Sequence, residues 1–261
     1  MFAEMDWDDE CDVVCTGAGV AGLSVAVSAA HEGADVLVAA RPAEPPDRRW
    51  WPIDCGDAET VAYLAELTAD FDAARLECDE DDLPVRVVAA DSGANSRTVP
   101  PFVGSRMRDW AQQCVCSPSG FLYTRVTDWP TATVALSGGE VWEVAEVGTL
   151  TSDGDDPLAA LHRWLTDEAA DRGVDRLSTT GLDRLVLDAG MVAGAVFDTE
   201  DGPYAVRARH GVLLCPQAET SGNRRSTVPH GVEMRVALVG RAGSRFGRVE
   251  LLRDATDAGM Y

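Results

Sequence analysis

The chain has 261 residues, which is enough to bury one large hydrophobic core or two smaller ones. Its formal net charge of −22 argues against nucleic acids and anionic membrane surfaces as general partners. All 22 basic residues are arginines, so the chain has no lysine to form a Schiff base, to anchor pyridoxal phosphate or to serve a Walker-type phosphate loop.

A glycine-rich turn follows the first predicted strand and leads into a helix predicted over residues 23–30. Gly17, Gly19 and Gly22 have the Gly-x-Gly-x-x-Gly spacing of a dinucleotide-binding turn. In such a turn the first glycine permits the tight bend, the second leaves room for a pyrophosphate, and the third lets helix and strand pack closely. A second strand, predicted over 35–40, follows at the distance of a βαβ unit. We therefore predict that these three glycines bind a cofactor, the alternative being a chance glycine turn.

The stretch around this turn is uncharged from residue 13 to residue 30, which is long enough to raise a membrane helix as an alternative. The glycine spacing and the polar residues Thr16, Ser24 and Ser28 argue against a membrane helix. Residues 1–10 are acidic, whereas a secretory signal peptide begins with a basic segment. We therefore expect a cytoplasmic protein without a transmembrane segment.

The end of the second strand departs from the usual dinucleotide-binding pattern. In these folds an acidic residue at this place accepts hydrogen bonds from the ribose hydroxyl groups. Ala40 stands there, and its side chain cannot accept such bonds. The next residue, Arg41, either meets a phosphate or lies in solvent.

A tryptophan–proline pair follows at Trp51 and Pro52, and residues 57–67 have the pattern of an amphipathic helix with an acidic first turn. Together with the glycine turn, these features resemble the flavoprotein superfamily of fumarate reductases and 3-ketosteroid dehydrogenases. Members of that superfamily carry a glutamate at the end of the second strand and a Gly/Ser-rich flavin loop after it. Here Ala40 replaces the glutamate, and the loop over 42–49 contains no glycine.

The second part of the resemblance comes from the order of elements later in the chain. A helix, a strand, a three-stranded meander and a buried strand are predicted at residues 158–169, 174–178, 182–188, 191–198, 204–209 and 211–215. This order is that of glutathione-reductase-type FAD-binding domains. The resemblance implies an α/β protein with a Rossmann-like fold of this type, whose mostly parallel sheet carries a β-meander and an inserted α+β region. Family members follow the closing strand with an Ala-Thr-Gly-Gly-like turn, where this chain has Cys215 and Pro216.

The resemblance also divides the chain. The first part of the dinucleotide-binding domain, an inserted or capping region, the second part of that domain and a basic C-terminal segment are expected at residues 1–52, 53–150, 151–218 and 219–261. Within the inserted region, a strand is predicted over 83–90 and a short helix over 106–115. Tyr123, where a turn enters another strand, is either an acid that protonates a carbon substrate or a packing residue.

The resemblance implies that FAD binds at the three glycines. The activity would be hydride transfer between the flavin and a carbon–carbon bond of a hydrophobic, steroid- or acyl-like small molecule. No catalytic residue is identified. The alternative is a degenerate, non-catalytic subunit that has lost FAD and supports a partner chain. The alanine at the end of the second strand, the shortened loop and the changed closing turn favour it, because each lost polar contact costs about 1–3 kcal/mol.

Residues 219–261 are rich in arginine in an otherwise acidic chain. Arg241, Arg245 and Arg248 can hold a phosphate or a carboxylate, dock on an acidic partner, or pair with the protein's own acidic surface. Full-length family members continue beyond this point with a strand and a helix that cover the flavin side of the sheet, and an apolar surface without that cover usually marks an interface. We therefore expect one subunit of a homo- or hetero-oligomer, with these three arginines at or near the contact.

Cysteine and histidine give no sign of a metal site. The seven cysteines include no Cys-x-x-Cys pair, so neither a disulfide framework nor a zinc site is predicted. Cys114 and Cys116, one residue apart, are expected to be buried or idle thiols, the alternative being a pair that chelates a ligand or reacts. The four histidines are scattered without the spacing of metal ligands.

Overall fold

The computed structural model describes residues 5–41, 51, 53, 55–71, 83–88, 104–125, 131–135, 141–151, 156–216 and 231–254. The predicted flavin loop over 42–49 lies outside the described residues. The elements in chain order are β1 (Asp9–Cys15), α1 (Val20–His31), β2 (Val36–Ala40), α2 (Ala58–Leu67), β3 (Val85–Val88), α3 (Gly104–Cys116), β4 (Gly120–Tyr123), β5 (Ala132–Ala135), β6 (Val141–Thr151), α4 (Pro157–Asp171), β7 (Asp175–Ser178), β8 (Gly181–Asp188), β9 (Met191–Thr199), β10 (Gly202–Leu214), β11 (Glu233–Gly240) and β12 (Phe246–Asp254).

One part of the sheet has the parallel arrangement that the βαβ pattern predicts. Its strands lie in the order β7, β2, β1 and β10, and each neighbouring pair is parallel. Val13 of β1 pairs with Val36 of β2 on one side and with Gly211 of β10 on the other. The prediction that the first strand and the strand ending near residue 215 belong to one sheet is therefore confirmed.

The sheet as a whole is mixed, and the expectation of a mostly parallel sheet is wrong. Among the described residues, four strand pairings are parallel and seven are antiparallel. The fourth parallel pairing joins β3 to β12. Beyond β10 the order continues as β4, β12, β11, β6 and β5, and each neighbouring pair along this path is antiparallel. The cause is β4, whose Tyr123 and Leu122 pair antiparallel with Leu213 and Leu214 of β10.

A single long strand, β10, joins the meander to the parallel part. Its first half pairs with β9, which in turn pairs with β8, so the predicted three-stranded meander is present. Two separate strands are expected here, but β10 runs unbroken from Gly202 to Leu214. Gly211 has φ +140°, and a Cβ atom there would lie 3.1 Å from the ring of Tyr123. Glycine at this position therefore lets the strand continue past β4 without a clash.

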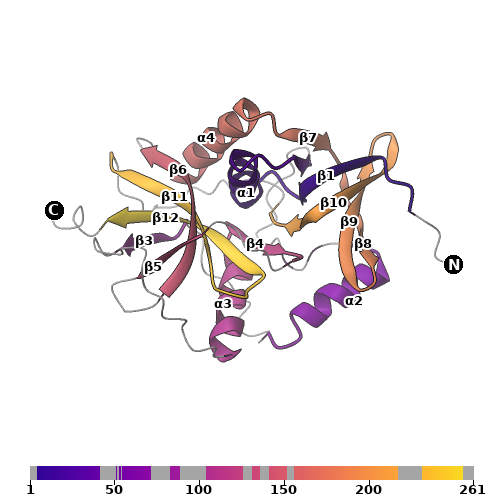
Figure 1. Cartoon of the computed structure of the whole chain (residues 1–261), viewed down its shortest axis with the longest axis horizontal. Helices are drawn as coiled ribbons and strands as arrows, with labels where there is room; N and C mark the ends of the chain where they lie inside the picture. The colour runs from indigo at the N-terminus through magenta and orange to yellow at the C-terminus, as the bar shows by residue number, and fades with distance from the viewer. Residues whose placement is uncertain are drawn as a thin grey trace.

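Helix α1 lies inside the curled sheet (Figure 1). It packs against β1, β2 and α4, and also against β4, β6, β11 and β12. Its residues from Val20 to Val27 are all buried. A helix that is apolar all round is a buried helix in a globular protein, which explains the long uncharged stretch in the sequence. No helix in the described part of the chain is both long and apolar enough to span a bilayer.

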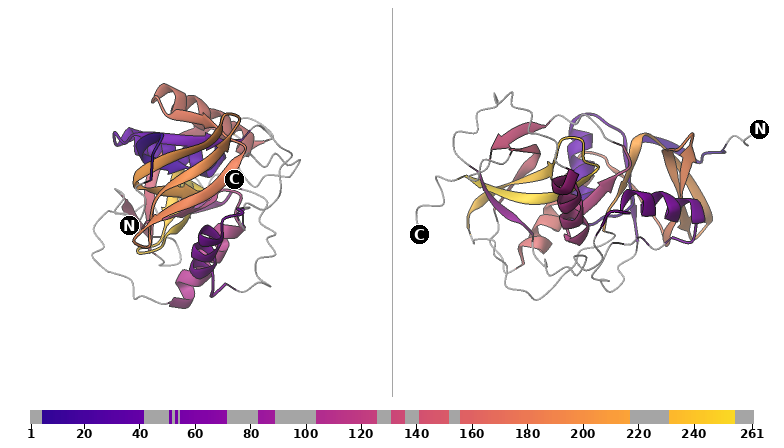
Figure 2. Two further views of the ribbon diagram at one scale, coloured as in Figure 1. Left: turned by 90° about the vertical axis from the view of Figure 1, so that its right-hand side faces the viewer. Right: turned by 90° about the horizontal axis from the view of Figure 1, so that it is seen from below.

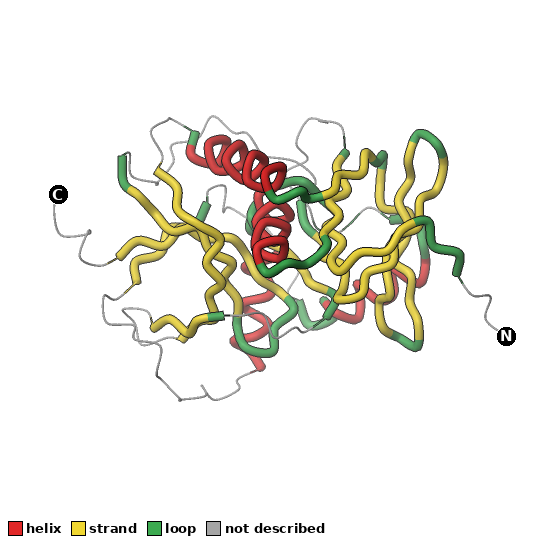
Figure 3. The backbone as a smooth tube through the Cα atoms, turned by 45° about the horizontal axis from the view of Figure 1, so that its top comes forward, coloured by secondary structure: helices red, strands yellow, loops and turns green. Residues whose placement is uncertain are grey.

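The helices cover both faces of the sheet. α1 and α4 lie on one side, and α2 and α3 lie on the other (Figure 2). The strands gather in two groups with the helices between them (Figure 3). The predicted helix over 57–67 is α2, and its N-cap Asp57 accepts a 2.8 Å hydrogen bond from the Thr60 backbone N–H. The Thr60 hydroxyl in turn accepts a 2.9 Å hydrogen bond from the Leu185 N–H, which fixes α2 to β8.

Candidate functional site

The predicted cofactor residues Gly17, Gly19 and Gly22 lie together where β1 turns into α1, and all three are buried. Gly19 is the N-cap of α1. A Cβ atom on Gly22 would lie 1.9 Å from the Gly17 carbonyl oxygen and 3.0 Å from the Cys215 sulfur. Gly22 is therefore required for the close packing of α1 on the turn, as the fingerprint predicts.

The segment that follows β10 closes over this turn. The Gly19 N–H donates a hydrogen bond to the Pro216 carbonyl oxygen, with 3.3 Å between N and O. The Cys215 N–H donates to the Thr16 hydroxyl at 3.3 Å, and the Cys215 thiol contacts the Gly17 carbonyl at 3.5 Å. A dinucleotide pyrophosphate is held by backbone N–H groups of such a turn. The Gly19 N–H already has a partner from this chain, so the turn does not fit a pyrophosphate as it stands.

A histidine from α4 contacts the same turn from another side. The ring Nε2 of His162 lies 2.9 Å from the carbonyl oxygen of Ala18. Gly19 itself has φ −70° and ψ 177°, an extended conformation that any residue adopts. The N-cap residue is a glycine, so it supplies no side-chain cap to the start of α1. The backbone of the turn is thus bonded to two distant parts of the chain, at Pro216 and His162.

The cysteines near this turn are packing groups. Burial raises the pKa of the Cys215 thiol to about 12 and holds the pKa of the Cys15 thiol well above its usual value. Both thiols therefore stay protonated and unreactive at neutral pH. Cys114 is buried and is not part of a disulfide. Cys116 differs from the expectation, because it is disulfide-bonded.

The end of β2 offers no acceptor for a ribose. The Ala40 carbonyl accepts a 2.9 Å hydrogen bond from the Thr179 N–H, which ties β2 to the end of β7. Arg41 lies against the start of β8, where a Cβ atom on Gly181 would be 2.5 Å from one nitrogen of the Arg41 guanidinium. Arg41 is half-buried, so part of its side chain stays open to solvent, and both sequence alternatives for it stay predictions.

A second candidate site is a hollow beside the hairpin that joins β11 and β12 (Figure 1). It encloses about 550 Å³, part of it open to solvent. Its walls come from β4, β6, β11 and the hairpin. Tyr123 lines it, is 5 % exposed and has its pKa raised by burial, so it is a packing residue rather than an acid poised to transfer a proton. Periodicity does not predict this hollow, because it forms between strands far apart in the sequence.

The three arginines predicted at a partner contact have different environments. Arg248 is 6 % exposed, so the structure corrects the expectation for this residue: it is buried inside the chain. Arg241 lies over the Trp142 ring, with its guanidinium carbon 4.1 Å from the ring centroid. Arg245 donates a 3.2 Å hydrogen bond to the hydroxyl of Tyr63. Arg241 and Arg245 are half-buried and line the hollow.

Arg248 belongs to a buried group that we call the arginine–tryptophan cluster, made up of Arg86, Arg241, Arg248, Trp110, Trp142 and Glu250. Glu250 is fully buried, and its carboxylate accepts 2.7 Å hydrogen bonds from Arg86 and Arg248. The two tryptophan rings meet edge to face at 4.6 Å. Charges buried in this way are tolerated only when they are paired and hydrogen-bonded. Here Arg86 comes from β3, and Arg248 lies two residues from Glu250 on β12 itself.

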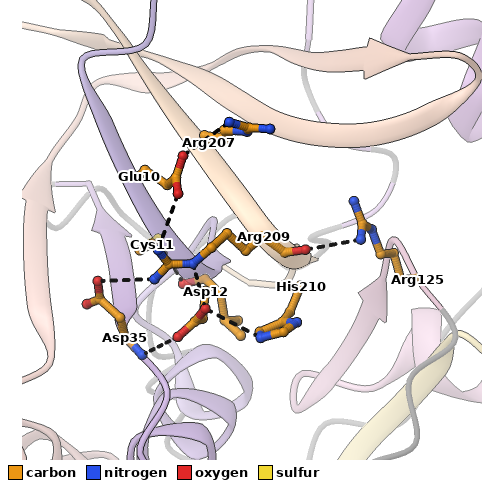
Figure 4. A network of polar contacts seen from close by, with 9 residues as sticks. Glu10, Cys11, Asp12, Asp35, Arg125, Arg207, Arg209 and His210 are labelled. Carbon is orange, nitrogen blue, oxygen red and sulfur yellow. Dashed lines mark hydrogen bonds and ion pairs between the residues drawn. The ribbon is translucent and has the colours of Figure 1, made fainter.

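A third polar group joins the starts of β1 and β2 to β10 (Figure 4). Arg209 bonds Asp12 at 2.8 Å and Glu10 at 3.2 Å, and its guanidinium lies 3.9 Å from Asp35. The Arg209 hydrogen bond is the largest cause that lowers the pKa of Asp12. The backbone carbonyl of Arg209 accepts a 3.1 Å hydrogen bond from the Arg125 guanidinium. Among the described residues, no group of three or more His, Cys, Asp or Glu side chains could hold a metal ion.

Comparison with known proteins gives matches to solved structures alone. No family model matches the chain, and no curated protein matches it. The 3-ketosteroid-Δ4-(5α)-dehydrogenase from Rhodococcus jostii RHA1 is 20% identical over 80% of this chain and 46% of its own, with a TM-score of 0.34. A flavocytochrome c3 fumarate reductase is 14% identical over 77% and 33%, with a TM-score of 0.31. The OxyS anhydrotetracycline hydroxylase from Streptomyces rimosus is 17% identical over 77% and 30%, with a TM-score of 0.31.

These neighbours are FAD-dependent oxidoreductases, and they include both enzyme classes named in the sequence resemblance. The chain spans less than half the length of each of the three. Identities of 20% or less and TM-scores near 0.3 carry no argument about activity. The activities that these names describe therefore belong to the neighbours alone.

Proposed function

We propose that this chain is a non-catalytic binding protein that uses a flavoprotein-like fold, and that its glycine turn holds the fold together rather than FAD. The observation that carries this proposal is the hydrogen bond from the Gly19 N–H to the Pro216 carbonyl. With the Cys215 contacts to Thr16 and Gly17, it occupies the turn with the chain's own backbone. Admitting a pyrophosphate would require these contacts to break and the Cys215–Pro216 segment to move.

The ribose side of the same site supports the proposal. Ala40 has no side-chain acceptor, and its carbonyl already accepts the Thr179 N–H. Each polar contact that a bound dinucleotide would lack costs about 1–3 kcal/mol, and every 1.4 kcal/mol weakens binding about tenfold. Two or three such losses would weaken the binding of a dinucleotide by orders of magnitude.

A second candidate function is an FAD-dependent oxidoreductase that moves hydride to or from a carbon–carbon bond of a hydrophobic, steroid- or acyl-like substrate. Two observations favour it: the glycine fingerprint is complete, and the N-cap of α1 is a glycine that supplies no side-chain cap. In this case Gly17, Gly19 and Gly22 would hold the pyrophosphate, after the Cys215–Pro216 segment had moved away. FAD, when bound, would supply the hydride chemistry.

Cofactor titration separates the two functions. The purified protein should show no flavin absorbance and no heat of binding with FAD, NAD or NADP. The variant Gly19→Val should then change nothing in the titration, because there is no ligand to displace. A yellow protein whose flavin is lost in Gly19→Val would overturn the proposal and establish the oxidoreductase alternative.

The proposal includes a partner chain, as a homo- or hetero-oligomer with Arg241 and Arg245 near the contact. Both residues are half-buried at the hairpin, which leaves part of each side chain open to solvent. Light scattering on the purified protein measures whether it self-associates. The same measurement on the double variant Arg241→Gln and Arg245→Gln shows whether these two arginines contribute to the contact. A monomer in both forms would remove self-association from the proposal.

A further inference from the structure

The hollow beside the β11–β12 hairpin combines an apolar floor with a positive rim. Phe121, Tyr123 and Leu238 line it and belong to the same apolar cluster, so they supply aromatic and aliphatic surface on one face of β4 and β11. Ligand pockets are typically concave and mostly apolar, with a few placed polar groups. The hollow has such a lining and is partly open to solvent, so part of a bound ligand would stay exposed.

The charges around the hollow are mainly positive. Arg125, Arg241 and Arg245 line it, and the acidic residue among its lining is Glu143. The chain as a whole has 44 acidic and 22 basic residues, so three arginines against one glutamate reverse its general charge balance. A cationic rim in an acidic protein favours an anionic ligand and repels a cationic one.

Two of these arginines have donors to spare. Arg125 bonds two backbone carbonyls, those of Arg209 and Val192, and its Nε is buried without a hydrogen-bond partner among the described residues. Arg245 bonds the neutral hydroxyl of Tyr63. Within the described ranges, neither arginine forms an ion pair with a carboxylate. Guanidinium groups held in place but unpaired with an acid are suited to bind a carboxylate.

One end of the hollow lies away from the glycine turn. β10 runs towards Pro216, which contacts the turn, while β4 runs antiparallel to it. Arg125 follows β4 and reaches the carbonyl of Arg209, well before the end of β10. Its end of the hollow therefore lies along β10 on the side away from the turn, and closure of the turn leaves it unaffected.

We propose that this hollow binds a small organic monocarboxylate with a flat aromatic or short acyl body. The apolar body would lie on Phe121, Tyr123 and Leu238, and the carboxylate would accept hydrogen bonds from Arg245 and Arg125. This inference rests on the proposed binding function and names its ligand class. Inorganic phosphate lacks the apolar body and is excluded, because the floor contributes through burial of apolar surface.

Calorimetric titration with 2-naphthoate tests the proposal, with 2-naphthamide as the neutral probe of the same shape. We expect 2-naphthoate to bind at least tenfold more tightly than the amide. Arg245→Gln should weaken 2-naphthoate by about tenfold and leave the amide unchanged. Arg235→Gln is the matched control, because Arg235 lies on β11, is paired with Glu146 and does not line the hollow. It should bind as the unmodified protein does.

The variants are compared only after thermal unfolding shows that they are folded. Arg125→Gln is the second variant if Arg245→Gln loses its fold, and it should also weaken 2-naphthoate about tenfold. Equal binding of acid and amide, no binding of either, or equal losses in the control would each overturn the proposal. Uptake of FAD alongside 2-naphthoate binding would overturn the proposed function and leave the hollow's ligand class standing, so the two failures are distinguishable.

Discussion

The parallel and the antiparallel parts of the sheet differ in the side chains that they bury. Among the described residues, the parallel part buries no charged side chain, whereas the antiparallel part does. Around α1 the buried residues that the structure describes are mainly aliphatic, such as Val13 and Val38, and none is charged. In the antiparallel part β12 is buried on both faces, yet it carries Arg248 at 6 % and Glu250 at 0 % exposure. The first part is held by apolar burial, which has no preferred direction, and the second by charges that need a set geometry.

The difference shows where the fold tolerates change. Apolar packing accepts exchanges of similar volume at small cost. A buried ion group accepts almost none, because the loss of one partner leaves the other charged and desolvated. The stability of the fold should therefore respond most strongly to substitutions in the arginine–tryptophan cluster. It should respond least to substitutions in the exposed ion-pair network around Arg209.

The largest effect is expected from Glu250→Gln, which keeps the shape and removes the charge that pairs Arg86 and Arg248. Breaking a buried pair costs about 3–5 kcal/mol. Chemical denaturation measures the change in the free energy of unfolding. Glu146→Gln is the control, because Glu146 is 50% exposed and lies 3.6 Å from Arg235. Similar losses in both variants would contradict the contrast between the two parts of the sheet.

A smaller effect is expected from Gly22→Ala in the apolar part. The added Cβ would lie 1.9 Å from the Gly17 carbonyl, so α1 must shift away from the turn. Overpacking of this kind costs about 1–3 kcal/mol. Gly104→Ala is the matched control, since a Cβ there meets nothing within 4 Å. A stable Gly22→Ala protein would show that the turn is looser than its hydrogen bonds indicate.

The smallest effect is expected from Asp12→Asn, in the exposed ion-pair network around Arg209. The hydrogen bond from Arg209 lowers the pKa of Asp12, so the carboxylate stabilises the fold above its unfolded pKa of about 4. This contribution is lost as the pH falls through the lower, folded pKa. Thermal unfolding at pH 7 should show a melting temperature lower by about 2 °C in the variant. The gap should close in strong acid, and a gap that widens there would reverse the assigned sign.

Much of the fold is predictable from local patterns in the sequence. The glycine turn, α2 with its Asp57 cap and the meander of β8, β9 and β10 all carry short-range signals, and the structure has each of them. The partners of β4 are not predictable in this way. Its pairing with β10 joins Tyr123 to Leu213, and periodicity within either strand says nothing about which distant strand lies beside it.

The candidate sites follow the same division. The three glycines are found from their spacing, but the Pro216 carbonyl that closes the turn is not, because a backbone contact leaves no trace in side-chain chemistry. Arg248 was expected at the surface, since arginine is rarely buried. The alternation of side chains along the strand could have corrected this expectation. Arg248 and Glu250 are two residues apart in β12, so their side chains point to the same face and can pair there. Val249 and Leu251 occupy the other face.

The long strand β10 also sets the order in which the chain can fold. Glu10 in β1 is bonded to Arg207, 197 residues later, whereas Asp12 is bonded to Asp35, only 23 residues away. At about 5–20 residues per second of synthesis, β1 waits roughly 10–40 s for its second neighbour. During that time β1 and β2 can pair while the other edge of β1 stays open. Refolding should accordingly be slow and governed by this late closure, since pairings distant in sequence form slowly.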